Sequence, residues 1–331
     1  MPRTSHLLLQ LLLLLSGATL AAQEDTALRP DEQLSGPQPV YTGIYLMNLY
    51  DLDINAYSYY ADFYIWFKWK GELDPMNIEF VNAIEKWGFT MEPFHDTAKI
   101  LTDGYAYNGM RVEGRFYHAF ELNRFPLEKH VLDLRIENIE YDLNQMMFLP
   151  DTQDHLIRSD LTLPGWHVEE ATMKTHDNFY ETDFGEGKEG QSNFSNFTFQ
   201  LQLSRPLTYF GFKLMLPLTI VIIASLGALF IIPGFVDARI SLPIGGLLTA
   251  VFLQQSYESA LPDVGYMVLM DKIYLAAYLL IACVMARVIL TANRNNADNF
   301  DRMKAKKSDR RLALRLFAGF WIVSAVVIAV S

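Results

Sequence analysis

At residues 240–257 the sequence reads ISLPIGGLLTAVFLQQSY. This apolar stretch is close to the ~20 residues that cross a bilayer as one helix. Steps of four and three residues place one set of side chains on a single helical face. They are Ser241, Gly245, Leu248, Phe252, Gln255 and, just beyond the stretch, Ser259. Polar groups that face hydrocarbon are costly, so this polar face is expected to look toward protein or water.

A packing face of small residues between helices is the alternative interpretation. It accounts for Gly245 and Gly246 but poorly for Gln254, Gln255 and Glu258. The polar side chains therefore favour a face in contact with water.

Three further apolar stretches, at residues 209–232, 267–290 and 312–330, also have the length of membrane spans. Together with residues 240–257 they predict a four-helix transmembrane domain at residues 205–331. The short segment 293–311 is rich in Lys and Arg, which is typical of a cytoplasmic loop. Both ends of the mature chain are then expected outside the cytoplasm.

The first 22 residues contain a leucine-rich run at 7–15, followed by small residues that end at Ala22. This pattern predicts a secretory signal peptide at residues 1–22, cleaved near Ala22. An uncleaved amphipathic anchor is the alternative. In either case the next segment begins outside the cytoplasm.

The composition of the 331-residue chain, with 51% hydrophobic and 20% charged residues, points away from disorder and toward a membrane protein. Its single cysteine, Cys283, excludes an intrachain disulfide and a cysteine-based zinc site. Residues 23–204 carry 31 acidic side chains against 13 basic ones. This balance excludes a nucleic-acid partner and suits a surface that gathers cations.

Residues 41–204 contain segments in which β-branched and aromatic residues dominate, at 61–69, 130–136, 166–172 and 194–203. Turn signals such as Asn108-Gly109 and Pro164-Gly165 separate them. The pattern predicts an all-β, immunoglobulin-like sandwich of about ten antiparallel strands. We assign it to an extracellular domain at residues 23–204.

Several short motifs lie in the predicted β domain and next to or within the first two predicted spans. They are Phe125-Pro126-Leu127-Glu128, Arg205-Pro206 before the first span, Pro217 within that span and Leu261-Pro262 after the second span. With the order of a β domain and four helices, they make the chain resemble the pentameric ligand-gated ion channels, the Cys-loop receptor superfamily. The resemblance covers nearly the whole mature chain and implies a pentamer around a central pore.

The sequence also departs from the family pattern. His118 and Leu132 occupy the positions of the two family cysteines, so the signature disulfide is absent, as in prokaryotic members. The cytoplasmic loop is short. Ile139 stands where receptors for amines place a tryptophan, so a complete aromatic cage for a quaternary ammonium is not expected.

The resemblance implies that the second span lines the pore. Asp237, just before this span, matches the position of the acid in cation-selective members, and five copies would form a ring that attracts cations. An acidic N-cap of the helix is the alternative, and the two are compatible. The expected pore-lining residues are Asp237, Ser241, Gly245, Leu248, Phe252, Gln255 and Ser259, with Leu248 and Phe252 as the hydrophobic gate. Packing between helices is the simpler alternative for them.

The resemblance further implies a network that couples the two domains. Arg205 is expected to contact Glu128 and either Asp51 or Asp53, since its planar guanidinium can pair with two carboxylates. The facing connector supplies Pro262 and Tyr266. A surface ion pair of little energetic worth is the alternative.

For the agonist, the resemblance implies a site at the subunit interface. The candidates are Tyr64, Trp66, Phe94, Glu140, Tyr141, Tyr180 and Phe184. Aromatic side chains of a β-sandwich more often belong to its core, which is the alternative.

The six histidines of the mature chain all lie in its extracellular half. Histidine titrates near neutral pH, so protons are an alternative agonist, although scattered histidines are usually structural. No metal-ligand spacing, cofactor motif or nucleophile with a base partner is evident, so we expect no enzyme, no metal and no cofactor.

The sequence thus predicts a prokaryotic, homopentameric, cation-selective channel gated by a small molecule or by protons. It is expected in the inner (plasma) membrane, with several spans and the N-terminal domain in the periplasm or extracellular space. Its partners would be four identical subunits, membrane lipids, monovalent cations and the agonist. A non-conducting membrane receptor and an anion-selective channel on the same fold are the alternatives, and Asp237 speaks against both.

Overall fold

Side-chain alternation builds the first half of the chain. In β2 (Ser58–Trp69), Phe63, Ile65 and Phe67 are fully buried. Tyr64 and Trp66 point to the opposite face, as the pleat of a strand requires. The structure is a computed structural model that describes residues 36–152, 155–185, 192–294 and 301–331, so the predicted signal peptide at 1–22 lies outside the described residues.

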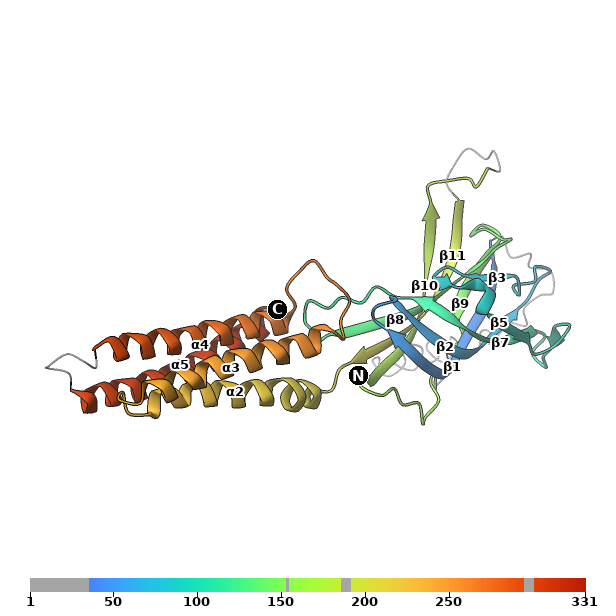
Figure 1. Cartoon of the computed structure of the whole chain (residues 1–331). Coiled ribbons are helices and arrows are strands. Elements are labelled where there is room, and N and C mark those ends of the chain that lie inside the picture. Colours follow the sequence, from blue (N-terminus) through green and yellow to red (C-terminus); the bar gives the residue numbers. More distant parts are fainter. Residues whose placement is uncertain (1–35, 153–154, 186–191, 295–300) are drawn as a thin grey trace, which may run out of the picture. The chain divides into compact units, whose positions relative to one another are not determined.

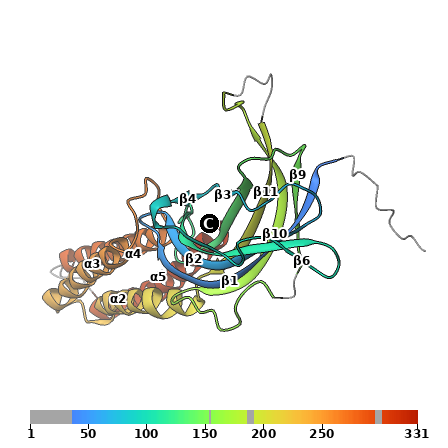
Figure 2. The same cartoon turned by 90° about the vertical axis from the view of Figure 1, so that its right-hand side faces the viewer.

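Two sheets form within the described residues (Figures 1 and 2). One has seven strands, which are β1 (Gln38–Asp53), β2, β4 (Ala83–Ile84), β5 (Thr90–Pro93), β6 (Lys99–Ile100), β7 (Ala106–Tyr117) and β9 (Met146–Pro150). The other has four, in the order β10 (His167–Tyr180), β11 (Ser192–Ser204), β8 (Lys129–Asn138) and β3 (Ile78–Phe80). All pairs are antiparallel except β1 with β9, and the short helix η1 (Lys86–Gly88) follows β4.

Aromatic side chains join the two sheets into a sandwich. The ring of Phe63 on β2 lies 5.7 Å from that of Phe80 on β3, and Phe80 lies 5.6 Å from Phe116 on β7. All three side chains are buried. Edge-to-face packing of this kind adds to the burial of a large apolar area, which holds the sheets together without a disulfide.

The second half of the chain is helical. Its elements are η2 (Tyr209–Met215), α2 (Leu216–Gly227), η3 (Ala228–Phe230), α3 (Val236–Glu258), α4 (Leu269–Arg294) and α5 (Arg302–Val330). Among the described residues, four helical segments are long and apolar enough to cross a membrane, and η2, α2 and η3 together make the first of them. The predicted fold class, a β-sandwich followed by four transmembrane helices, is confirmed.

Two helices begin earlier than the hydropathy of the sequence indicates. α3 begins at Val236 instead of residue 240, and α5 begins at Arg302 instead of residue 312. Hydropathy marks where lipid begins, whereas Lys, Arg and Ala sustain a helix in water. Asp301 caps α5, since its carboxylate accepts hydrogen bonds of 3.0 Å from the backbone N–H of Met303 and Lys304. Residues 302–311, expected in the cytoplasmic loop, are therefore helical.

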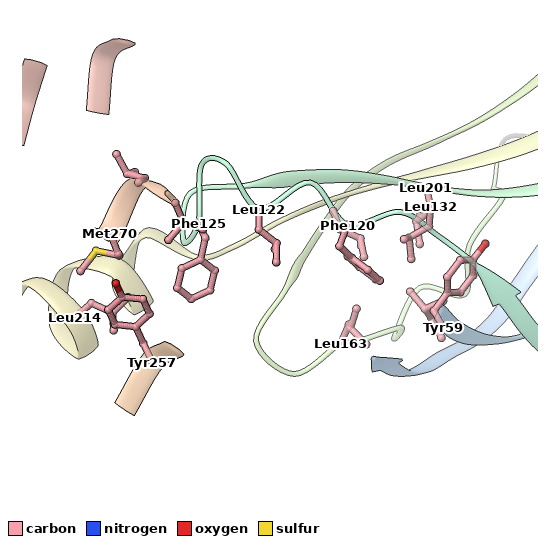
Figure 3. Packing of buried hydrophobic residues seen from close by; sticks show 14 of the residues in the cluster. Tyr59, Phe120, Leu122, Phe125, Leu132, Leu163, Leu201, Leu214, Tyr257 and Met270 are labelled. Atoms are coloured by element: carbon pink, nitrogen blue, oxygen red, sulfur yellow. The ribbon is translucent and has the colours of Figure 1, made fainter. Parts of the chain in front are cut away.

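The loop between β7 and β8 touches the helices directly. The backbone N–H of Leu269 donates to the carbonyl of Asn123 at 3.0 Å, at the start of α4. Phe125 stacks on Tyr257 of α3 with ring centroids 6.0 Å apart (Figure 3). This loop therefore contacts the end of α3 and the beginning of α4.

Candidate pore and agonist sites

One side of α3 packs against the rest of the bundle. Its buried residues recur at steps of four, three, four and seven, and they are Arg239, Pro243, Gly246, Ala250 and Tyr257. Gly246 allows α2 to approach closely, because a Cβ at this position would lie 2.0 Å from Oγ of Ser225.

The opposite side of α3 is exposed. Leu248 is nine residues from Arg239, about two and a half turns of helix, so the two point in opposite directions. The seven residues that the sequence predicts to line the pore are all exposed on this side, and we call them the exposed stripe: Asp237, Ser241, Gly245, Leu248, Phe252, Gln255 and Ser259. Leu248 and Phe252 are 56% and 60% exposed, which leaves two large apolar side chains without cover in a single subunit.

Asp237 lies in the first turn of α3 and is exposed. The N-cap position belongs to Phe235, which makes no side-chain cap, so Asp237 is a residue of the helix itself. Its carboxylate there is favoured by the helix dipole. One turn further on, the Ser241 hydroxyl donates to the Asp237 carbonyl at 2.8 Å. The hydroxyl oxygen keeps its lone pairs for water or a passing cation.

The only base of α3, Arg239, is turned away from the exposed stripe. Its side chain is 1% exposed. Nη2 lies 2.5 Å from Oδ2 of Asp309 on α5, and Nε donates to the carbonyl of Ala228 at 3.0 Å. Arg287 of α4 takes the other Asp309 oxygen, with Nε 2.7 Å from Oδ1. One fully buried carboxylate thus joins α3, α4 and α5.

The predicted agonist residues fall into two groups. The first lies on the outer face of the seven-stranded sheet, where Tyr64 and Phe94 have ring centroids 5.8 Å apart. The Arg111 guanidinium lies 5.7 Å from the centre of the Tyr64 ring. Nearby, the Trp66 indole N–H donates to Asp151 at 2.7 Å. These aromatic side chains are half-buried and lie outside the core between the sheets.

The second group lies on the four-stranded sheet. The Tyr180 ring lies 5.3 Å from that of Phe184 and 6.0 Å from that of Phe194. Glu140 and Tyr141 follow β8, where both backbone N–H groups donate to Asn138 Oδ1 at 2.9 Å. The two groups thus belong to different sheets.

Sequence reasoning missed Glu137, which lies beneath the second group. Its side chain is 1% exposed and accepts hydrogen bonds from Asn178 at 2.7 Å, Asn196 at 2.8 Å and Tyr180 at 2.9 Å. Burial, together with this bond to Glu137, raises the pKa of Tyr180 to about 12, so the phenol stays protonated and donates. The Tyr180 phenol and two amides thus direct three hydrogen bonds at this one carboxyl group. Its only sequence signal is an acid directly after the buried Ile136 of a strand.

At the junction of the two domains, Arg205 pairs with Glu128. Their side chains are 12% and 1% exposed. The guanidinium also lies against the rings of Trp166, Phe125 and Tyr209, at 4.3, 5.3 and 5.4 Å from their centres. Sequence reasoning missed Trp166, which belongs to the segment that leads into β10. Cation–π contacts and burial make this pair unlike a solvated surface ion pair.

The other predicted coupling residues make different contacts. Asp51 pairs with Arg115 of β7. Asp53 accepts hydrogen bonds from the backbone N–H groups of Asn55 and Ala56, at 2.9 and 3.0 Å. The Tyr266 hydroxyl accepts from the backbone N–H of Leu122 at 3.2 Å, and Pro262 is half-buried in the same connector between α3 and α4. The two acids at the end of β1 thus contact residues of their own domain in this structure.

Two histidines lie close to this junction. His118 and His130 have ring centroids 5.5 Å apart, and His130 lies 5.4 Å from Trp166. Burial, together with the charges of His118 and Arg205, lowers the pKa of His130 to about 4. Both imidazoles are therefore expected to be neutral at pH 7, because burial also lowers the pKa of His118.

The sequence is similar to curated proteins from animals and from a bacterium. A glutamate-gated chloride channel of Drosophila melanogaster is 23% identical over 169 residues, 51% of this chain and 35% of that protein. A gamma-aminobutyric acid receptor subunit beta of Caenorhabditis elegans is 24% identical over 183 residues, 54% of this chain and 30% of that protein. A proton-gated ion channel of Gloeobacter violaceus is 23% identical over 279 residues, 77% of this chain and 73% of that protein. No family model matches the chain.

The bacterial alignment is too long to fit within either half of the chain, so it includes parts of the β-sandwich and of the helices. These similarities, together with the fold, support the superfamily of pentameric ligand-gated ion channels for this chain. The predicted superfamily is thereby confirmed. The chain matches about a third of the length of each of the two animal relatives. Its relatives are channels and receptors rather than enzymes, and its four candidate spans indicate a multi-pass membrane protein.

Proposed function

We propose that the chain is one subunit of a homopentameric, cation-selective channel, with α3 from each subunit lining the pore. The observation that carries this proposal is the placement of charge on α3. Its two acids, Asp237 and Glu258, are exposed at opposite ends of the helix, whereas its only base, Arg239, is buried against Asp309. Around a fivefold axis the exposed stripe would present carboxylates and hydroxyls to the permeating ion.

The chloride channel among the relatives raises the alternative of an anion pore on the same fold. An anion pore needs positive or neutral groups at its narrow end. Arg239 is unsuited to that role, because it points into the bundle on the side opposite the exposed stripe. We therefore propose that Asp237 determines the selectivity for cations over anions. The same proposal places the channel in a bacterial inner membrane, with the β-sandwich on the outer side.

Replacing Asp237 with arginine tests this assignment. The change would put five positive charges where five carboxylates stood, so cations would be repelled. We expect the reversal potential in a salt gradient to change sign, measured as currents from purified protein in liposomes. A matched change at the other end, Glu258→Gln, is expected to keep the sign.

An unchanged reversal potential in a conducting Asp237→Arg channel would contradict the proposal. The same recordings, repeated over a pH series with no added ligand, separate proton gating from gating by a small molecule. A protein that assembles and binds ligands but never conducts would instead be a receptor without a pore.

We propose Leu248 as the centre of the closed gate, with Phe252 one helical turn nearer the C-terminal end of α3. Five such side chains could exclude water from a narrow pore. Leu248→Ser should hydrate it and favour opening. Half-maximal current is then expected at roughly tenfold lower agonist concentration, which corresponds to about 1.4 kcal/mol in the opening equilibrium. Thr249→Ser, on the neighbouring exposed position, is the control, and equal responses in both variants would place the gate elsewhere.

We propose that the agonist carries a cationic amine. Glu137 supports this, because its buried side chain bonds to Tyr180 behind the aromatic rings, where a carboxylate would attract a cation. Glu137→Gln should weaken activation by short primary amines at least roughly tenfold, since it removes the charge with little change in shape. Concentration–response curves for a panel of such amines would measure this. Glu170→Gln, at an exposed acid of β10 in the same sheet, is the matched control, and an equal loss there would remove Glu137 from the site.

A further inference from the structure

A buried acid of α5 holds the only base of α3 inside the bundle. Nη2 of Arg239 lies 2.5 Å from Oδ2 of Asp309, and the two side chains are 1% and 0% exposed. Nε of Arg239 donates to the carbonyl of Ala228, near the end of the first span, at 3.0 Å. The guanidinium is therefore held by two of its nitrogens, on the side of α3 that packs against the other helices.

The exposed acid of the same helical turn points the other way. Asp237 and Arg239 are two residues apart, which in an α-helix is a rotation of about 200° and a rise of about 3 Å. Asp237 is exposed, whereas Arg239 is buried. The two backbone positions are closer than the Debye length of about 8 Å. An Arg239 side chain that reached water would therefore offset the attraction of Asp237 for cations.

Asp309 is the group that keeps Arg239 out of water. A buried charge without a partner is strongly destabilised, and the long apolar stem of an arginine lets its head move to water. Without the carboxylate, Arg239 would keep only the Ala228 carbonyl. Arg287 of α4 cannot replace the acid, because it carries the same charge and itself binds Oδ1 of Asp309 at 2.7 Å. Loss of the acid is thus expected to release Arg239 toward the start of α3.

We infer that Asp309 is a positioning residue for ion selectivity, which acts by holding Arg239 away from the exposed stripe of α3. The inference rests on the proposed function, in which α3 lines the pore, and it adds a determinant from a helix that carries none of the stripe. Asp309 is fully buried, so it would act without touching the ion. Its charge would decide whether five carboxylates alone, or five carboxylates beside five bases, face the permeating ion.

Asp309→Asn tests the inference, because asparagine keeps the size of the side chain and an acceptor for Arg287 but removes the charge. We expect the permeability ratio of cations to anions, measured as reversal potentials in liposomes, to fall roughly tenfold. Arg239→Gln/Asp309→Asn also removes the released base and should restore the ratio. The matched control is Arg302→Gln/Asp309→Asn. Arg302 is an exposed base beside the turn before α3, since a Cβ on Gly234 would lie 3.4 Å from its Nη1. Both double variants have the same net charge, but the control should keep the lowered ratio.

Arg239→Gln alone is a second test that does not depend on the folding of Asp309→Asn. In this variant Asp309 stays paired with Arg287, so the bundle is expected to assemble. A base that is already held out of the pore contributes little to the field on the ion. The permeability ratio should therefore stay nearly unchanged.

Chemical labelling gives a readout that needs no current. Phenylglyoxal reacts with guanidinium groups that solvent reaches, and peptide mass spectrometry identifies the labelled arginines. Arg239 should be protected in the parent and labelled in Asp309→Asn, whereas the exposed Arg302 should be labelled in both. A parent that is anion-selective, or that never conducts, would contradict the proposed function, and the same labelling pattern would still support the positioning role of Asp309.

Four results would each overturn the inference. They are labelling of Arg239 in the parent, continued protection of Arg239 in Asp309→Asn, a large change of the permeability ratio in Arg239→Gln, and equal recovery of the ratio in the two double variants.

Discussion

Asp309→Ala is expected to destabilise the helical bundle by about 3–5 kcal/mol. Asp309 is fully buried, and its carboxylate is shared by Arg239 and Arg287. Without it, Arg239 would stay buried with the Ala228 carbonyl as its remaining hydrogen-bond partner. An uncompensated charge in this position costs far more than an exposed ion pair contributes. A lower melting temperature and a loss of the assembled oligomer in size-exclusion chromatography would measure the effect.

Two variants make this expectation specific. Asp301→Ala removes an exposed acid that caps the same helix, and a lost cap typically costs about 1 kcal/mol. Arg239→Met/Asp309→Leu removes both buried charges, and replacement of a buried pair by apolar residues is often neutral. We therefore expect the double variant to be more stable than Asp309→Ala alone. If Asp309→Ala and Asp301→Ala lower the melting temperature equally, the buried network is not a main support of the bundle.

The exposed stripe of α3 could be predicted from the sequence, whereas the network behind it could not. The stripe follows from the helical repeat, because steps of four and three residues define a face without any knowledge of neighbouring helices. Arg239 and Asp309 are 70 residues apart, and their contact depends on how three helices pack. Because the residues around Asp309 are basic, the sequence predicted a cytoplasmic loop there, whereas Asp309 lies in α5.

The same distinction holds for the agonist residues. Alternation along β2 predicts that Tyr64 and Trp66 share a face. It cannot show that Tyr180 belongs to the other sheet, nor that Glu137 lies beneath it, because these relations depend on strand order. A buried acid in a strand has no pattern that distinguishes it from an exposed one. Local periodicity therefore predicts faces, and the pairing of faces requires the fold.

The pair formed by Arg205 and Glu128 is expected to be the strongest energetic link between the two domains. Arg205 directly follows β11 and leads into the first span, and Glu128 ends the loop that contacts α3 and α4. Arg205→Ala would leave the Glu128 carboxylate buried without its partner, which costs on the order of 3–5 kcal/mol. Arg205→Lys would keep the charge but lose the planar group that stacks on Trp166. Both changes should therefore impair opening while agonist binding is largely retained.

A double-mutant cycle on the opening equilibrium measures this link. Arg205→Ala, Glu128→Ala and the double variant should be non-additive by roughly 0.5–3 kcal/mol, as is typical of residues in direct contact. The matched control is Arg115 with Asp51, an ion pair of the same kind in which Asp51 is 54% exposed, for which we expect about 0–1 kcal/mol. Trp166→Leu should lower the apparent coupling of Arg205 to Glu128, because the indole holds the guanidinium in place. Strict additivity in the Arg205 cycle, in channels that still assemble, would show that the signal takes another route. The stack of Phe125 on Tyr257 would then be the next contact to test, since it joins the same loop to the pore helix.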